Sequence, residues 1–280
     1  MKILDVTDLS VKSGTGLALV SNVSFSLEPG ARLGLIGESG SGKSLTALAI
    51  MGLLPTELNV SGSVLLSDGK TASQQILDAP EKVLNQIRGA VVSIVFQEPL
   101  TALDPLMKTG KQLAEPLRRW HGLKGATLQA EIFNALDEVR IGNPKRIADS
   151  YPYEISGGER QRAAIAMALA CKPALLIADE PTTALDVTVQ AEVLALLDTV
   201  VASRGMSLLF ISHDLAVVSR ITDSVLVLKD GEVVEAGSLQ NILNEPKHPY
   251  TRELVSSAKE LDAALTISAR SGGDHDISNS

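Results

Sequence analysis

Residues 32–44 read RLGLIGESGSGKS, an apolar run that leads into a glycine-rich loop. The loop, GESGSGKS at 37–44, matches G-x-x-x-x-G-K-[ST], a pattern whose backbone N–H groups converge on phosphate oxygens. Lys43 would add a positive charge near the β- and γ-phosphates, and the Ser44 hydroxyl is placed to ligate Mg²⁺. The apolar stretch that follows predicts a helix whose positive N-terminal end favours an anion. We therefore expect a nucleoside triphosphate to bind at Gly37, Glu38, Ser39, Gly40, Ser41, Gly42, Lys43 and Ser44.

Similar apolar runs recur at AVVSIVF (90–96), ALLIAD (174–179) and SLLFISH (207–213). They are nearly continuous rather than alternating, as the buried strands of a parallel sheet are. Helical patterns separate them, and the pattern after ALLIAD carries an apolar stripe at Val189, Val193, Leu196, Leu197 and Val200. Strands that alternate with helices predict an α/β fold with a parallel sheet.

Other segments predict smaller units around this sheet. ILDVTDLSV, NVSFSLEPG and SVLLSDG alternate apolar and polar residues, which predicts an antiparallel β subdomain. Residues 99–155 lack strong strand patterns and predict an inserted helical subdomain, with breaks at Gly110, Gly122, Gly142 and Pro144. Residues 223–237 predict a hairpin that turns at Asp230-Gly231. The polar end of the chain predicts a disordered tail.

Two carboxylates, Asp179 and Glu180, end the run ALLIADE, and His213 ends the next run along the chain. Since parallel strands meet at their carboxyl ends, these side chains are expected beside the phosphate loop. Asp179 would hold Mg²⁺. Glu180 would orient the attacking water as a general base, and His213 would contact the γ-phosphate.

Residues 155–162 read ISGGERQR, a Ser-Gly-Gly turn before a helical pattern that Pro173 stops. Such a turn at a helix N-terminus is a second anion cradle. Two cradles could close on one nucleotide only if the second came from another chain. The sequence therefore predicts that Ser156, Gly157 and Gly158 bind nucleotide held by a partner.

In this order, these motifs resemble those of the nucleotide-binding domain of ABC transporters. GESGSGKS resembles the Walker A loop, ALLIADE the Walker B strand and ISGGE the signature motif, although Ile155 and Glu159 differ from the usual LSGGQ. The resemblance makes Gln97 a catalytic and Mg²⁺-contacting Q-loop residue. It places Glu159 of the signature motif and Asp186 of the D-loop near the nucleotide, and makes His213 the switch histidine. It implies a P-loop NTPase (RecA-like) core with an antiparallel β subdomain and an inserted helical subdomain, and ATP and Mg²⁺ as ligands. The stretch VKSGTGLALVSN offers no aromatic residue to stack on adenine.

The C-terminal string HPYTREL, at 248–254, resembles the oligopeptide/dipeptide/nickel importer subfamily. We accordingly divide the chain into a nucleotide-binding domain over 1–240 and a C-terminal extension over 241–280. The resemblance implies an ATPase at the cytoplasmic face of the inner membrane, working with two transmembrane permease subunits. It also implies a second ATP-binding subunit, identical or paralogous, and an extracytoplasmic solute-binding protein that acts indirectly. Peptide, nickel, glutathione and other small solutes remain open as cargo.

Bulk composition narrows these alternatives. The chain has 280 residues, of which 25 are Lys or Arg and 33 are Asp or Glu, a net charge of −8. This acidic balance disfavours nucleic acid, and hence a soluble ABC-class ATPase acting on ribosomes or DNA. The single cysteine, Cys171, predicts that no iron–sulfur cluster is held. A regulatory cassette that does not hydrolyse ATP would lack a catalytic group, yet Lys43, Asp179, Glu180 and His213 are all present. A different P-loop enzyme, such as a kinase, would leave the motif ISGGERQR unexplained.

Overall fold

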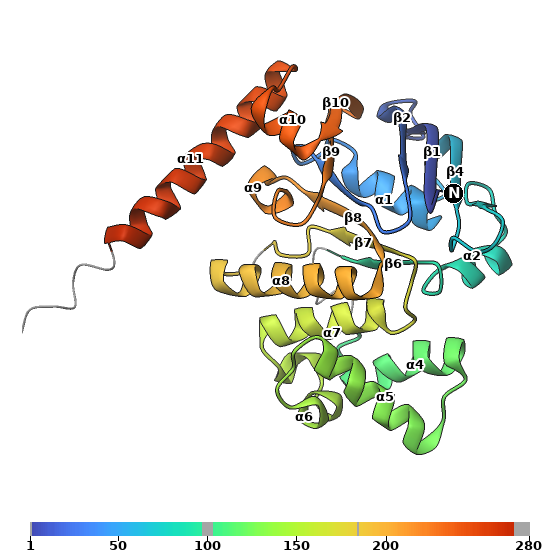
Figure 1. Cartoon of the computed structure of the whole chain (residues 1–280). Coiled ribbons are helices and arrows are strands. Elements are labelled where there is room, and N and C mark those ends of the chain that lie inside the picture. Colours follow the sequence, from blue (N-terminus) through green and yellow to red (C-terminus); the bar gives the residue numbers. More distant parts are fainter. Residues whose placement is uncertain (1, 97–102, 184, 272–280) are drawn as a thin grey trace, which may run out of the picture.

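A parallel sheet lies at the centre of the protein, as the apolar runs predict (Figure 1). The computed structural model describes residues 2–96, 103–183 and 185–271. Within them this sheet has six strands in the spatial order β10-β9-β3-β8-β7-β6. Their bounds are β3 (Arg32–Ile36), β6 (Val92–Val95), β7 (Leu175–Asp179), β8 (Ser207–Ser212), β9 (Ser224–Lys229) and β10 (Glu232–Ser238). The strands run parallel except β10, which pairs antiparallel with β9.

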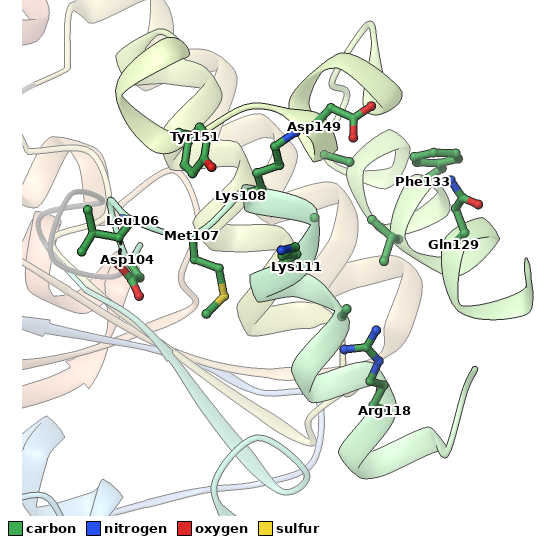
Figure 2. A pocket seen from close by; sticks show the side chains of 14 residues that line it. Asp104, Leu106, Met107, Lys108, Lys111, Arg118, Gln129, Phe133, Asp149 and Tyr151 are labelled. Atoms are coloured by element: carbon green, nitrogen blue, oxygen red, sulfur yellow. Dashed lines mark hydrogen bonds between the residues drawn. The ribbon is translucent and has the colours of Figure 1, made fainter. Parts of the chain in front are cut away.

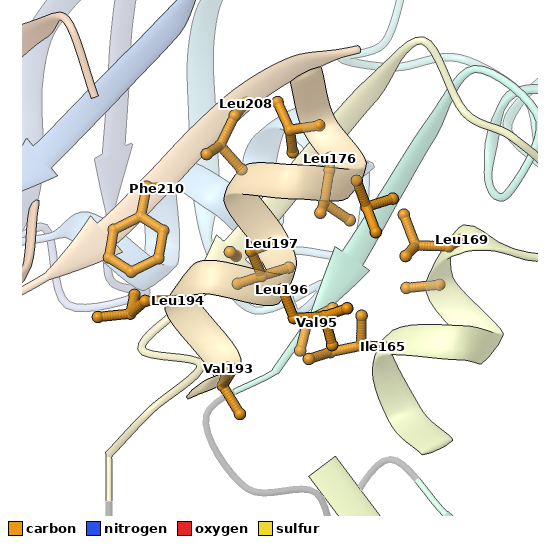
Figure 3. Close-up of a cluster of buried hydrophobic side chains, with 14 of the residues drawn as sticks. Val95, Ile165, Leu169, Leu176, Val193, Leu194, Leu196, Leu197, Leu208 and Phe210 are labelled. Carbon is orange, nitrogen blue, oxygen red and sulfur yellow. The ribbon is translucent and has the colours of Figure 1, made fainter. Parts of the chain in front are cut away.

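Both faces of the central sheet are buried, which explains why its strands read as continuous apolar runs. Successive side chains point to opposite faces. Leu176, Leu208 and Phe210 pack with α7 (Gly157–Leu169) and α8 (Val187–Arg204), as Figure 3 shows. Leu175 and Leu209 belong instead to the cluster formed with α1 (Lys43–Met51) and the antiparallel sheet.

The predicted antiparallel β subdomain is present. Its strands, in the order β2-β1-β4-β5, are β1 (Leu4–Lys12), β2 (Ala18–Leu27), β4 (Asn59–Leu66) and β5 (Gln74–Gln75). The alternating segments at 3–11, 22–30 and 63–69 overlap the three longer strands. The sequence did not predict the two-residue β5 or the short helix α2 (Glu81–Ile87), since neither is long enough to show a period.

A helical subdomain is inserted between β6 and α7, as predicted. It contains α4 (Thr109–His121), α5 (Gly125–Glu138), α6 (Pro144–Asp149) and the 3₁₀ turn η1 (Pro152–Glu154). The predicted break at Gly110 is wrong, because this residue lies in the first turn of α4. A Cβ at Gly110 would lie 2.8 Å from the Ala148 carbonyl oxygen, so the glycine permits close packing of α4 on α6.

The C-terminal part of the chain packs against the same core. The hairpin turns at Asp230 (φ 50°) and Gly231 (φ 82°), the positive angles that a type I′ turn requires. Beyond α9 (Leu215–Val218) and this hairpin lie α10 (Leu239–Asn244) and α11 (Pro249–Ser271), which runs away from the body in Figure 1. The hydrophobic cluster that includes α8 also contains the buried side chains of Ile242, Tyr250 and Val255. The residues after the predicted boundary at 240 therefore share one core with the residues before it. The predicted disordered tail covers roughly the last dozen residues. Its first residues are helical instead, since α11 continues to Ser271, and the rest of it lies outside the described residues.

Candidate functional site

The glycine-rich loop at 37–42 joins β3 to α1 and has the geometry of an anion cradle. A Cβ on Gly37 would lie 2.2 Å from the Leu228 carbonyl oxygen, so only glycine fits at the start of this loop. Gly42 is the N-cap of α1 with φ 95°, in the left-handed region that favours glycine. No side chain among the described residues caps this helix start. Its first N–H groups are therefore available to a phosphate.

Lys43 is the buried cation of the site, with 5% of its surface exposed. Its Nζ donates to the Gly37 carbonyl oxygen at 2.7 Å and to the Glu38 carbonyl oxygen at 2.8 Å. Burial lowers the pKa of Lys43, although the charges of Glu180, Asp179 and Glu38 act in the opposite direction. The ammonium thus sits among carboxylates at the base of the loop, where a phosphate would give it a further anionic partner.

Asp179, at the end of β7, is a buried carboxylate. Its Oδ1 atom has no hydrogen-bond partner among the described residues. Burial raises the pKa of Asp179, while a hydrogen bond with the Ser44 side chain acts against this rise. An orphaned carboxylate oxygen beside a hydroxyl is the oxygen donor set that Mg²⁺ prefers, so these two residues fit the ion.

Glu180 follows at the same strand end in a strained backbone conformation. Its φ is 47°, the left-handed region, and Pro181 comes next. The Glu180 N–H donates to the Ile211 carbonyl oxygen at 2.9 Å, which ties the turn to β8. The Thr183 hydroxyl donates to Glu180 Oε2 at 2.9 Å, and His213 Nδ1 lies 3.3 Å from Glu180 Oε1. These contacts fix the position of the carboxylate.

These elements enclose a cavity of about 560 Å³. Its lining comes from the glycine-rich loop, the start of α1, the turn after β7 and the end of β8. The lining residues are Glu38, Ser39, Gly40, Gly42, Lys43, Ser44, Leu45, Glu180, Thr183 and His213. The structure therefore brings together most of the residues predicted for the phosphate site. The sequence reasoning missed Thr183, although it lies three residues after Glu180 in the turn that Pro181 begins.

The predicted signature residues lie elsewhere. Ser156 is the N-cap of α7: its Oγ accepts from the Glu159 N–H at 3.2 Å, and Glu159 Oε2 accepts from the Ser156 N–H at 2.9 Å. Glu159 also pairs with Arg146. Burial acts to raise the pKa of Glu159, but the bonds from Ser156 and Arg146 together lower it. The carboxylate is thus occupied in a capping box.

Two further predicted residues are placed differently from the loop residues. Asp186 is the N-cap of α8, where its Oδ1 accepts from the Val189 N–H at 2.9 Å. Like the signature residues, it is absent from the described lining of the cavity. Gln97 lies outside the described residues. The nucleotide contacts expected of these residues stay predictions.

Comparison with known families gives two matches. The ABC transporter family model matches residues 20–183, and the model for the oligopeptide/dipeptide transporter C-terminal region matches residues 234–278. The chain is 44% identical to the glutathione import ATP-binding protein GsiA of Escherichia coli K12, over 88% of this chain and 40% of that protein. It is 45% identical to the peptidoglycan transport ATP-binding protein YejF of Agrobacterium fabrum, over 91% and 47% respectively. The chain thus spans less than half the length of these curated relatives.

Solved structures give the same result for the fold. The ATP-binding cassette MJ0796, solved as a dimer bound to ADP and Pi, has a TM-score of 0.73 and 28% identity, over 84% of this chain and 98% of that one. The structure of cbiO1 from Clostridium perfringens has a TM-score of 0.73 and 26% identity, over 87% and 91%. These likenesses confirm the predicted P-loop NTPase fold with its β and helical subdomains. With the family match and the geometry of the cavity, they establish that the chain belongs to the ABC transporter family.

Proposed function

We propose that this chain binds and hydrolyses ATP as the motor subunit of an ABC importer. The observation that carries the proposal is the single cavity that joins the uncapped start of α1, the buried Lys43 and the Glu180–His213 pair. The helix start and Lys43 would hold the triphosphate by N–H groups and charge. No Phe, Tyr or Trp side chain lines the described part of this cavity, so the adenine base would gain little from stacking there.

In the hydrolytic step, Glu180 would accept a proton from water as the water oxygen attacks the γ-phosphorus and ADP leaves. Thr183 and His213 hold the two carboxylate oxygens, which leaves the carboxylate little freedom to rotate. The His213 side chain is 57% exposed, so its ring is accessible to the γ-phosphate from the cavity. Asp179 and Ser44 would hold Mg²⁺, with Gln97 as a further predicted contact. The ion would supply charge neutralisation at the phosphate oxygens.

A second ATP-binding chain would complete each site. The Ser156 cradle is formed and capped, yet it does not line the described cavity of its own chain. A head-to-tail pair would place the start of α7 from one chain against the triphosphate held by the other. The similar cassette MJ0796 was solved as a dimer bound to ADP and Pi, which supports the pairing of two such chains. The partner could be identical or paralogous.

The permease would dock on the helical subdomain. A cavity of about 630 Å³ lies there, and Leu106 at its edge is 86% exposed. Figure 2 shows Lys111 and Arg118 on α4, with Lys108 just before it and Phe133 of α5 across from them. The same rim also carries Asp104 and Asp149. An exposed apolar side chain beside a rim of mixed charge suits an amphipathic segment of a membrane partner. Within the described residues, no helix has the length and apolar character to cross a bilayer itself.

We place the chain at the cytoplasmic face of the inner membrane, bound to two permease subunits and served indirectly by a solute-binding protein. The relatives named for glutathione import and for peptidoglycan transport, together with the C-terminal match, favour a peptide-like solute. Nickel remains an alternative within the same subfamily. The acidic net charge of −8 and these relatives do not favour a role on ribosomes or DNA.

The direct test is Glu180→Gln in the purified chain. We expect hydrolysis to fall by about 10²–10⁴, the usual contribution of a positioned proton acceptor, with nucleotide affinity nearly unchanged. Glu57→Gln, which neutralises an exposed carboxylate that does not line the cavity, serves as the control and should keep the wild-type rate. Near-wild-type turnover in Glu180→Gln would remove Glu180 from the proposed role.

A further inference from the structure

The C-terminal HPY string reaches the phosphate-binding loop. The Glu38 N–H donates to the hydroxyl oxygen of Tyr250 at 2.8 Å, across 212 positions of sequence. Tyr250 itself is buried, with 3% of its surface exposed. Glu38 lines the nucleotide cavity, so this bond joins the start of α11 directly to the proposed site.

The bond fixes a peptide unit that Lys43 also holds. In the peptide between Gly37 and Glu38, the carbonyl oxygen accepts from Lys43 Nζ at 2.7 Å and the N–H donates to Tyr250. The Leu228 carbonyl oxygen also lies against Gly37, only 2.2 Å from where a Cβ would stand. A peptide plane held at both its carbonyl and its N–H cannot rotate without losing one of these bonds. Its orientation determines where the following loop N–H groups point.

Tyr250 is in turn held in place by the β9–β10 hairpin. The Glu235 carboxylate on β10 accepts from the backbone N–H groups of Lys247 and His248, both at 2.9 Å. The Lys229 ammonium at the end of β9 lies 4.9 Å from the centre of the Tyr250 ring, a cation–π contact. Farther along α11, Val255 is buried in the main core. The tyrosine therefore reaches the loop from a supported position.

We propose that Tyr250 is a positioning residue for nucleotide binding, which makes the C-terminal region a working part of the phosphate site. This inference rests on the proposed function, since it assumes that the cavity binds ATP. A bound phosphate would compete with the Gly37 carbonyl oxygen for the Lys43 ammonium. Tyr250 secures the same peptide from its other side, so the loop keeps its shape when the lysine turns to the ligand.

The test is Tyr250→Phe in the full chain, which removes the hydroxyl and keeps the ring. A neutral hydrogen bond contributes a factor of roughly 2 to 10, so we expect the Kd for ATP to rise about 2- to 10-fold. The KM for ATP should rise in parallel, with kcat within about twofold of the wild type, because Tyr250 does not contact the reacting atoms. Unchanged Kd and KM in Tyr250→Phe would overturn the inference.

Val255→Ala is the matched control, since it loosens the packing of α11 without touching the loop. We expect it to lower the Tm and leave the Kd for ATP within about twofold of the wild type. If it weakened ATP binding as much as Tyr250→Phe, the effect would belong to general packing and the inference would fail.

Hydrogen exchange distinguishes coupling between Tyr250 and the nucleotide from an effect of Tyr250 on stability alone. Coupling between two sites is reciprocal, so ATP should slow amide exchange at residues 250–255 in the wild type and not in Tyr250→Phe. If the wild type bound ATP without this protection, the coupling would be refuted while the proposed function would stand. A wild type that binds no ATP would instead refute the proposed function.

Discussion

Lys43→Met isolates the charge at the centre of the site. The side chain is 5% exposed, and methionine is similar to its aliphatic stem in length, so the substitution chiefly removes the ammonium. A charge-assisted hydrogen bond to phosphate contributes about 1.5–3 kcal/mol, which corresponds to roughly 10- to 100-fold in affinity. The carboxylates of Asp179, Glu180 and Glu38 surround the ammonium and would then repel the triphosphate. We therefore expect a loss near the upper end of this range.

The assay is a titration of the purified chain with ATP, with Lys70→Met as the matched control because Lys70 is exposed. Thermal unfolding without nucleotide should show that Lys43→Met is folded. The bonds from Lys43 to the loop carbonyls are lost, but so is the cost of burying a cation, and these effects oppose one another. A folded Lys43→Met chain that binds ATP within twofold of the wild type would refute our account of this lysine.

Two further substitutions test the neighbouring carboxylates. Asp179→Asn should raise the free energy of unfolding of the ligand-free chain by about 1 kcal/mol, since it removes a buried charge with an unpaired oxygen, and should abolish Mg²⁺-dependent tightening of ATP binding. A Tm below that of the wild type, or intact Mg²⁺ dependence, would contradict this. Glu159→Gln should lower stability at neutral pH by less than about 1 kcal/mol, because its ion pair with Arg146 is partly exposed. The folded-state pKa of Glu159 is lowered, so its contribution is present above the unfolded value of 4.5 and disappears as the pH falls through the folded value. In urea unfolding, the difference in stability between the two chains should therefore shrink as the pH falls below 4.5 and vanish once the pH lies below the folded-state pKa. A difference that did not shrink with falling pH would argue against the capping role.

Burial decides how much of the fold the sequence predicts. β7 and β8 are buried at every position, so their apolar runs identified them and their parallel pairing. The meeting of Lys43, Glu180 and His213 followed from strands that end at one edge of a sheet. The bond between Tyr250 and Glu38 could not be predicted, because nothing local in HPYTREL shows what its tyrosine contacts 212 positions away.

Glu159 illustrates a signal that was present but not used. Ser156 and Glu159 form the S-x-x-E pattern of a capping box ahead of an apolar helix, and the structure contains that box. The sequence reading assigned Glu159 to the nucleotide from the signature motif alone. In the structure, the Glu159 carboxylate accepts a hydrogen bond from the Ser156 N–H at the start of α7. This bond explains how a charged residue is accommodated at the last position of the signature motif. At Gly110 the sequence signal was misinterpreted. Glycine often ends a helix, but here its missing side chain lets α4 pack closely against α6.

The central claim is that the loop at 37–44 of one chain and the Ser156 turn of another hold the same triphosphate. A dimer that mixes a Ser156→Arg chain with a Lys43→Met chain tests it most directly. Each pure mutant dimer would contain no intact site, whereas the mixed dimer would contain one. We predict measurable ATP hydrolysis in the mixture and almost none in either pure mutant, and a mixture as inactive as both would contradict the shared site.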